Sequence, residues 1–278
     1  MEFNHDIETN GYEEEQPRRR IRNHRLRRGI YLLPSACTVA NMLCGYYAIL
    51  AVLEGNLTDF DNAAKAIGIA YVFDSLDGRI ARLMHTESAF GREFDSLADV
   101  ISFGIAPAFL AYSWGVRAMA AVNATQSLHL VKLGWLVGFI FLGCCAWRLA
   151  RFNIQGMAPG GNRYFVGLPT PAAAGMVAAV VHYFGTPIED VRLAFLWLGL
   201  LVILGVLMSS TVRYYSFKDI QWTKRQPSLA ILLLFLLIGA VVLESHPTLL
   251  IIASAYVGHG PILQLVRYVR HRTATRPA

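Results

Sequence analysis

The stretch "AAKAIGIAYVFDSLDGRIAR", residues Ala63–Arg82, begins as an apolar helix and then acquires two aspartates and two arginines before it ends. A second stretch, "GREFDSLADV" (Gly91–Val100), brings two more aspartates into the start of the next apolar run. A lone charge in a hydrocarbon environment is costly, so acidic residues inside membrane helices usually serve a function. Four carboxylates at the edges of two consecutive spans therefore indicate one shared site.

The composition of the whole chain places these stretches in a membrane protein. Its 278 residues are 55% hydrophobic and only 16% charged, with a mean hydropathy of +0.41, whereas a soluble domain carries about 25% charged residues. We predict an all-α fold, a polytopic transmembrane helical bundle of six to eight spans. The candidate spans lie at about 31–53, 63–82, 94–114, 133–147, 168–184, 193–209, 229–243 and 247–266.

The distribution of basic residues predicts the orientation of this bundle. With the N-terminus inside, 21 of the 25 Lys and Arg residues lie on the inner side. The four that remain outside are Lys65, Arg117, Lys132 and Arg192. This positive-inside pattern predicts that both termini and both aspartate stretches face the cytoplasm, and we expect a bacterial or archaeal plasma membrane.

Four regions follow from the same patterns. Residues 1–17 are predicted to be a disordered acidic tail, 18–30 a basic juxtamembrane segment, 31–266 the membrane domain and 267–278 a basic C-terminal tail. The cluster "RRRIRNHRLRR" (Arg18–Arg28) either binds anionic membrane lipids or only sets the topology. We expect no nucleic-acid partner, because this cluster adjoins a span.

The aspartates form one stripe on each of the two helices. At about 100° per residue, the first stripe spans about 100° of arc and comprises Asp74, Asp77, Gly78 and Ala81. The second spans about 80° and comprises Gly91, Asp95 and Asp99. The connection between them is short, so the helices are antiparallel neighbours whose stripes can face each other across a cytoplasmic cleft.

Clustered carboxylates repel one another unless a cation lies between them. Oxygen ligands suit hard cations such as Mg²⁺, Mn²⁺ or Ca²⁺, and paired metal ions are suited to phosphoryl transfer. The small residues Gly78, Ala81 and Gly91 leave room for a ligand, and Arg82 can pair with a phosphate oxygen. Ordinary interfacial ion pairs and close helix packing are the alternative explanations.

The spacing of these residues resembles a known signature, that of the CDP-alcohol phosphatidyltransferase family. The matching positions read Asp74-x2-Asp77-Gly78-x2-Ala81-Arg82-x8-Gly91-x3-Asp95-x3-Asp99. The resemblance implies a membrane-embedded helical enzyme that joins a CDP-linked lipid to an alcohol and releases CMP. It also implies a divalent cofactor, Mg²⁺ or Mn²⁺, as two ions.

The resemblance further assigns roles to individual residues. Asp74, Asp77 and Asp95 are implied to be metal ligands, and Asp99 both a ligand and the general base. Gly78 and Ala81 are implied to border the cytidine diphosphate, whose phosphate Arg82 holds. In the first span, Thr38 and Asn41 share one helical face and either contact the CDP-lipid or form helix-to-helix hydrogen bonds.

Two later stretches bear on the acceptor alcohol. "RLARFN" (Arg148–Asn153) and "GLPTPAAAG" (Gly167–Gly175) resemble the membrane-integral phosphatidylserine synthase branch of the family. That branch uses CDP-diacylglycerol and L-serine, so Arg148, Arg151 and Asn153 become candidates for binding the acceptor. The two arginines can also simply extend toward lipid headgroups.

Two other functions compete with this prediction. An arginine pair also suits glycerol 3-phosphate, the acceptor of phosphatidylglycerophosphate synthase. A cation transporter would also place carboxylates within the membrane, but transporters often carry repeated, broken helices in both halves, whereas the acidic residues here occupy one pair of spans. The resemblance is compatible with a homodimer, which the residues alone do not show.

Overall fold

The computed structural model describes residues 18–84, 88–117, 124–155, 164–215 and 227–274, and helices dominate these ranges. The helices are α1 (Arg18–Glu54), α2 (Leu57–Leu83), α3 (Ala89–Asp99), η1 (Val100–Ile105), α4 (Ala106–Tyr112), η2 (Ser113–Arg117), α6 (Ala124–Gln155), α7 (Thr170–Phe184), α8 (Val191–Ser209), α10 (Pro227–Leu243) and α11 (Ser245–Ala274). The predicted helical fold class is confirmed. The predicted acidic tail at residues 1–17 lies outside the described residues.

Five of the described helices are long and apolar enough to cross a membrane. They cover Ser35–Glu54, Ala89–Arg117, His129–Ile154, Val191–Ser209 and Ser245–Val266, and α7 is a shorter apolar helix. The protein is therefore an integral membrane protein. The second predicted span corresponds to α2, which has 27 residues but also carries several charged ones. The total number of spans and their orientation stay predictions.

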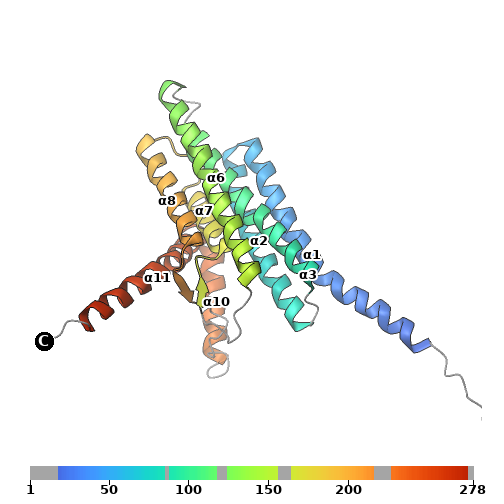
Figure 1. The fold of residues 1–278 in the computed structure, drawn as a ribbon. Helices are drawn as coiled ribbons and strands as arrows, with labels where there is room; N and C mark the ends of the chain where they lie inside the picture. Colours follow the sequence, from blue (N-terminus) through green and yellow to red (C-terminus); the bar gives the residue numbers. More distant parts are fainter. Residues whose placement is uncertain (1–17, 85–87, 118–123, 156–163, 216–226, 275–278) are drawn as a thin grey trace, which may run out of the picture.

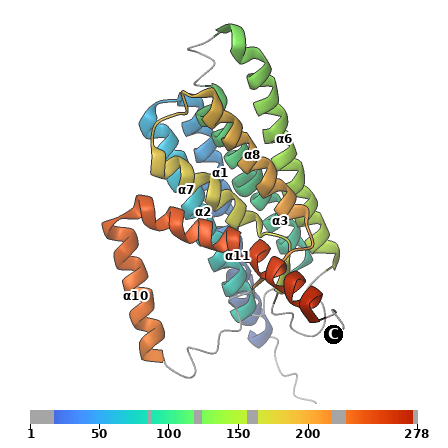
Figure 2. The ribbon, with the colours of Figure 1, turned by 90° about the vertical axis from the view of Figure 1, so that its left-hand side faces the viewer.

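Helices α1, α2, α6, α7 and α8 run side by side along a common direction (Figure 1). The described N-terminal part of α1 and the C-terminal part of α11 both extend from the lower end of this bundle in Figure 1. Helix α11 runs obliquely across the bundle, and α10 stands apart from it and packs on α11 (Figure 2). The end of the bundle where α2 ends and α3 begins is thus the end from which both described terminal helices leave.

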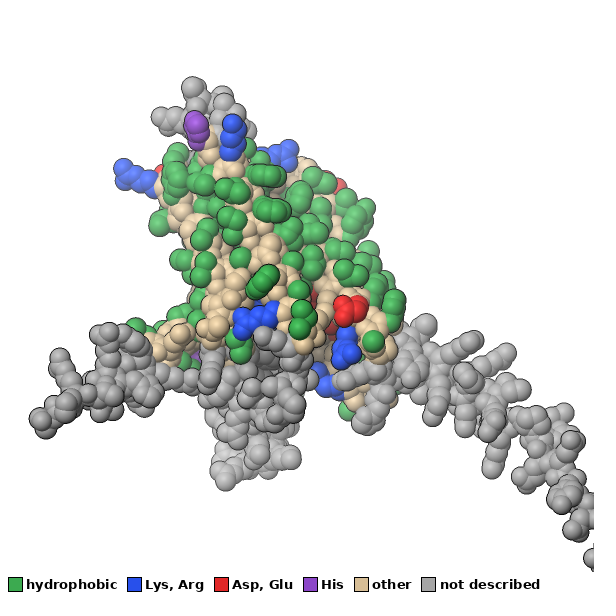
Figure 3. All heavy atoms as spheres, viewed as in Figure 1, with side chains coloured by type: hydrophobic (Ala, Val, Ile, Leu, Met, Phe, Trp, Pro, Cys, Tyr) green, Lys and Arg blue, Asp and Glu red, His purple; other side chains and the backbone are tan. Residues whose placement is uncertain are grey.

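The outer surface of the bundle fits a lipid environment. Hydrophobic side chains cover most of the visible flank, and charged side chains gather toward its two ends (Figure 3). Large apolar side chains that would be buried in a soluble protein are exposed here, including Leu43, Trp135 and Phe195. Burial in hydrocarbon accounts for this surface without a further partner.

Small residues let α1 pack closely against its neighbours. Ala48, Ala63 and Ala70 are fully buried, as is typical of close contacts between membrane helices. At Gly45 the approach is closest: a Cβ atom added there would lie 2.5 Å from the Ser102 Oγ and 2.7 Å from the Ser102 Cα. The contact fixes α1 against η1, the segment that directly follows Asp99.

This contact gives a first testable prediction. Gly45→Ala is expected to destabilise the protein by about 1–3 kcal/mol, because the new methyl group overlaps backbone that has to move. Gly68→Ala is the matched control, since a Cβ atom there meets nothing within 4 Å. Thermal unfolding in detergent should show a lower midpoint for Gly45→Ala only; equal midpoints for both variants would contradict the close packing.

The third predicted span contains a departure from regular α-helix. It is continuous from Ala89 to Arg117 but includes two π-helical segments, η1 and η2. Pro107 follows η1, has no backbone N–H and would crowd the carbonyl four residues earlier in a regular helix. The wider turn relieves this crowding, and π segments occur frequently at functional sites.

The structure adds secondary structure that the sequence analysis did not predict. The strands β1 (Tyr164–Val166) and β2 (Arg213–Tyr215) pair antiparallel, which the all-helical prediction did not include. Each has three residues, too few for the period-2 pattern to stand out from a loop. The basic segments 18–30 and 267–274 are helical and continue α1 and α11.

Candidate active site

Three of the four predicted aspartates come together where α2 faces α3. Each of Asp74, Asp95 and Asp99 offers a carboxylate oxygen, and these oxygens all lie within 4.8 Å of one another. The stripe geometry explains the result, because Asp74 faces α3 while Asp95 and Asp99 lie one turn apart. The three carboxylates are the core of the site.

The fourth aspartate, Asp77, is buried beside this group and is anchored by α1. Its Oδ2 accepts a hydrogen bond of 3.0 Å from the Thr38 Oγ1, and its side chain is only 4% exposed. It lies close enough to Asp74 and Asp95 for their charges to act on it. Asp77 therefore belongs to the same charged cluster, although it is outside the closest set of three.

Asp99 is held in place from α1 as well. The Asn41 Nδ2 donates to the Asp99 Oδ1 over 3.1 Å, and the Ser102 Oγ donates to the Asn41 backbone carbonyl over 2.9 Å. All three residues are buried, which fixes their side chains. Ser102, which the sequence analysis did not single out, thus positions Asn41 and through it Asp99.

The residues present fit a divalent cation. Four carboxylates are gathered in a largely buried place, and each oxygen is a ligand that hard cations prefer. The Asp95 Oδ1 and the Asn41 Oδ1 are buried and have no hydrogen-bond partner among the described residues. A buried oxygen that accepts no hydrogen bond destabilises the folded protein unless a cation or a ligand binds to it. The cluster therefore fits a divalent-metal site.

The glycines of the motif shape the approach to this cluster. A Cβ atom at Gly78 would lie 3.9 Å from both terminal nitrogens of Arg82, so the guanidinium extends over the bare glycine. Ala81, between them, is partly buried. The Gly91 N–H donates to the Ser88 Oγ over 2.9 Å and helps to begin α3. Arg82 is exposed and its guanidinium lies near Gly78, the residue after Asp77, where an anion can reach it.

The three predicted acceptor residues have different surroundings. The Arg148 Nη1 donates to the Thr170 Oγ1 over 3.3 Å, while its buried Nε has no partner among the described residues. Arg148 also lies within electrostatic range of Asp99 and Asp74. Arg151, one turn further, is partly buried.

Asn153 makes helix-to-helix contacts. Its Nδ2 donates to the Ser96 Oγ over 2.9 Å and approaches the Glu93 Oε2 at 3.4 Å. These bonds tie the end of α6 to α3, beside Asp95. Asn153 is exposed and remains an acceptor candidate, and its hydrogen bonds to α3 also support a role in joining the two helices.

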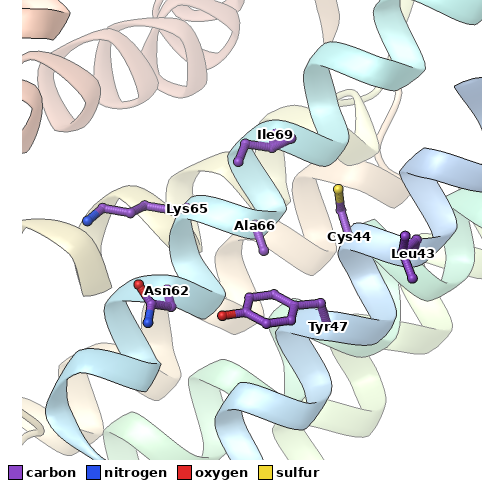
Figure 4. Close-up of a pocket in the computed structure, with 7 residues that line it drawn as sticks. All are labelled: Leu43, Cys44, Tyr47, Asn62, Lys65, Ala66 and Ile69. Carbon is purple, nitrogen blue, oxygen red and sulfur yellow. The ribbon is translucent and has the colours of Figure 1, made fainter.

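A hollow of about 510 Å³ also lies between α1 and α2, on another face (Figure 4). It is lined by Leu43, Cys44, Tyr47, Asn62, Lys65, Ala66 and Ile69. On α1, Leu43 and Tyr47 lie roughly opposite the face that carries Thr38 and Asn41. The hollow therefore opens on the outer, lipid-facing side and is separate from the carboxylate site.

The region that contains the site matches a known protein family. The family model of CDP-alcohol phosphatidyltransferases matches residues 31–207, more than half of the chain.

The chain belongs to the CDP-alcohol phosphatidyltransferase family.

Individual relatives share most of its length. It is 32% identical over 248 residues to a CDP-diacylglycerol–serine O-phosphatidyltransferase of Helicobacter pylori, covering 87% of this chain and 94% of the relative. A protein of the same name from Methanocaldococcus jannaschii is 34% identical over 169 residues, 61% of this chain and 71% of the relative. An archaetidylserine synthase of Methanothermobacter thermautotrophicus is 36% identical over 185 residues, 66% and 69% of the two chains. In this phosphatidyltransferase, the matched region contains the predicted signature and all four aspartates.

Proposed function

We propose that this protein transfers the phosphatidyl group of CDP-diacylglycerol to the hydroxyl of L-serine, giving phosphatidylserine and CMP. The observation that carries the proposal is the meeting of Asp74, Asp95 and Asp99 within 4.8 Å in a chain of this family. The choice of serine is supported by the relatives, which are named as serine transferases or as an archaetidylserine synthase.

The residues support an in-line transfer between two alcohols. The serine hydroxyl oxygen attacks the phosphorus that carries the lipid, a new P–O bond forms, and the bond to the CMP oxygen breaks. Asp99 accepts the hydroxyl proton, and Asn41 keeps its carboxylate in one orientation. Arg82 binds a phosphate oxygen of the nucleotide, close to the bare Cα of Gly78.

The cofactor we propose is a pair of Mg²⁺ or Mn²⁺ ions held by Asp74, Asp77, Asp95 and Asp99. When bound, such ions neutralise the pyrophosphate and stabilise the departing CMP. Thr38 and Asn41 orient the carboxylates of Asp77 and Asp99, and Ser102 in turn holds Asn41. Two of the four proposed ligands are therefore oriented before a cation binds.

The location of the site suits a lipid substrate. We propose that it faces the cytoplasm of a bacterial or archaeal cell at the inner edge of the plasma membrane, in line with the excess of basic residues on that side. The acyl chains then stay in hydrocarbon while the nucleotide meets water. A homodimer is part of the same proposal and is tested by the mass of the detergent-solubilised protein.

The acceptor is tested by measuring CMP release from CDP-diacylglycerol with purified protein and a panel of alcohols. We expect turnover with L-serine and little with glycerol 3-phosphate, inositol or glycerol. The buried Nε of Arg148 favours an acceptor with an anionic group, which both serine and glycerol 3-phosphate have. If CMP release required glycerol 3-phosphate and not serine, the proposed activity would be wrong, and the protein would be a phosphatidylglycerophosphate synthase.

A further inference from the structure

Helix α11 reaches the acceptor side of the site because it runs antiparallel to α7. At one end, the His182 ring nitrogens contact Asp61 and the Ser245 Oγ. Further along, the Ser254 Oγ contacts the Met176 Sδ at 3.8 Å. The next turns of α11 therefore arrive near the start of α7, where Thr170 pairs with Arg148.

A specific docking point holds α11 there. Pro261 has no N–H, so the carbonyl of Val257 lacks its usual helical donor, and the Tyr214 hydroxyl donates to it over 3.2 Å. Gly260 makes the approach possible, since a Cβ atom there would lie 2.4 Å from the Tyr214 ring. Burial raises the pKa of the Tyr214 hydroxyl to about 12, which keeps it a donor. The strand β2 thus sets the position of the turn that contains Tyr256 and His259.

This turn carries two polar aromatic side chains, those of Tyr256 and His259. Tyr256 is partly buried, packs against the core and lies within electrostatic range of the Arg148 guanidinium. Its ring stacks on that of His259, with centroids 6.4 Å apart, and on that of Tyr214 at 5.9 Å. The His259 Nδ1 and the Arg148 Nε are both buried without a hydrogen-bond partner among the described residues.

These two unpaired groups need complementary ligand groups. A buried Arg Nε–H calls for an anionic acceptor, and an imidazole nitrogen beside aromatic rings can accept from an ammonium group. Aromatic rings also attract a cation. An amino-acid alcohol offers both charges at once, whereas glycerol 3-phosphate has no cation.

We infer that Tyr256 and His259 form the α11 wall of the acceptor pocket and select an alcohol that bears an ammonium group. The inference rests on the proposed function, because it assumes that the acceptor binds at Arg148. It assigns the carboxylate of the amino-acid alcohol to Arg148 and its ammonium group to His259 and the Tyr256 ring. Helix α11 then contributes to specificity although it lies outside the region matched by the family model.

The test uses the full chain in detergent or nanodiscs and the variants His259→Ala, Tyr256→Phe and Tyr256→Ala. We expect His259→Ala to raise the KM for L-serine about tenfold or more, as for a lost hydrogen bond to a charged group. Tyr256→Ala should raise it several-fold, as for a lost contact between a cation and an aromatic ring. The KM for CDP-diacylglycerol should change less than about twofold. Tyr256→Phe keeps the ring and should retain most of the serine affinity.

Two further measurements separate recognition from simple support of the fold. Ser254→Ala, on the same helix but facing α7, is the matched control and should leave both KM values unchanged. In wild-type protein, 3-hydroxypropionate, which lacks the ammonium group, should compete with serine far more weakly than an amino-acid analogue does, and His259→Ala should reduce this difference.

The outcomes distinguish the inference from the function on which it rests. A wild-type protein that releases CMP with serine, together with unchanged serine KM values in the α11 variants, would overturn the inference alone. So would parallel changes in both KM values and in thermal stability, which would indicate a structural role. Absence of serine-dependent CMP release in the wild type would overturn the proposed function and the inference with it.

Discussion

Asp99→Asn is expected to lower CMP release about a thousandfold while the protein stays folded. The variant keeps the size of the side chain but cannot accept the acceptor's proton, a contribution of about 10²–10⁴ in rate. It also removes one negative oxygen from the closest set of three carboxylates. The measurement is the rate of CMP formation at saturating substrates, with thermal unfolding and gel-filtration profiles alongside.

The control for this variant is Asp190→Asn. Asp190 is exposed and caps α8 by accepting from the Arg192 N–H, and Asn caps a helix about as well as Asp. Asp190→Asn should therefore keep full activity. If Asp99→Asn retained more than about a tenth of the wild-type rate, Asp99 would be neither the general base nor an essential ligand.

Removal of divalent cations is expected to abolish turnover and to lower the stability of the protein. Without a cation, the four clustered carboxylates repel one another in a largely buried environment. EDTA should stop CMP release, and Mg²⁺ or Mn²⁺ added in excess should restore it. The unfolding midpoint should rise with metal concentration, because an ion that binds only the folded state stabilises it.

EDTA already saturated with Mg²⁺ is the control and should have no effect. In Asp95→Asn the dependence of the unfolding midpoint on metal should weaken, because the variant loses one charged oxygen of the cluster. Activity that persists through exhaustive chelation would contradict a metal-dependent transfer. If the unfolding midpoint of the wild-type protein did not change with Mg²⁺ or Mn²⁺ concentration, this would contradict metal binding at the carboxylate cluster.

Much of the candidate site follows from local periodicity. The helical repeat alone places Asp74 near Asp77 on one face and Asp95 near Asp99 on another, and a short connection makes the two helices neighbours. Length and apolar composition likewise predict membrane helices, because both depend on consecutive residues. These features need no knowledge of distant contacts, and the structure confirms the helices and the meeting of three carboxylates.

Other features depend on how helices far apart in the chain pack. That Asp77 turns toward Thr38 and Asp99 toward Asn41 is decided by the position of α1, which the close contact of Gly45 with Ser102 sets. Asn153, predicted to contact the acceptor, also bonds to Ser96 of α3, because the end of α6 lies beside that helix. Sequence spacing carries no information on such contacts between remote segments.

The position of α11 most clearly separates what residue order predicts from what packing decides. "GHGP" (Gly258–Pro261) reads only as an interrupted helix, and nothing in the linear order of residues connects it with Tyr214 or Arg148. In the folded chain the carbonyl that Pro261 leaves unpaired is taken by Tyr214, and Gly260 gives the ring its space. Residue order is therefore enough to predict the helices and their acidic faces, because both depend on residues within one or two helical turns of each other. The completed pocket depends on packing between segments more than forty residues apart, and only the tertiary structure supplies it.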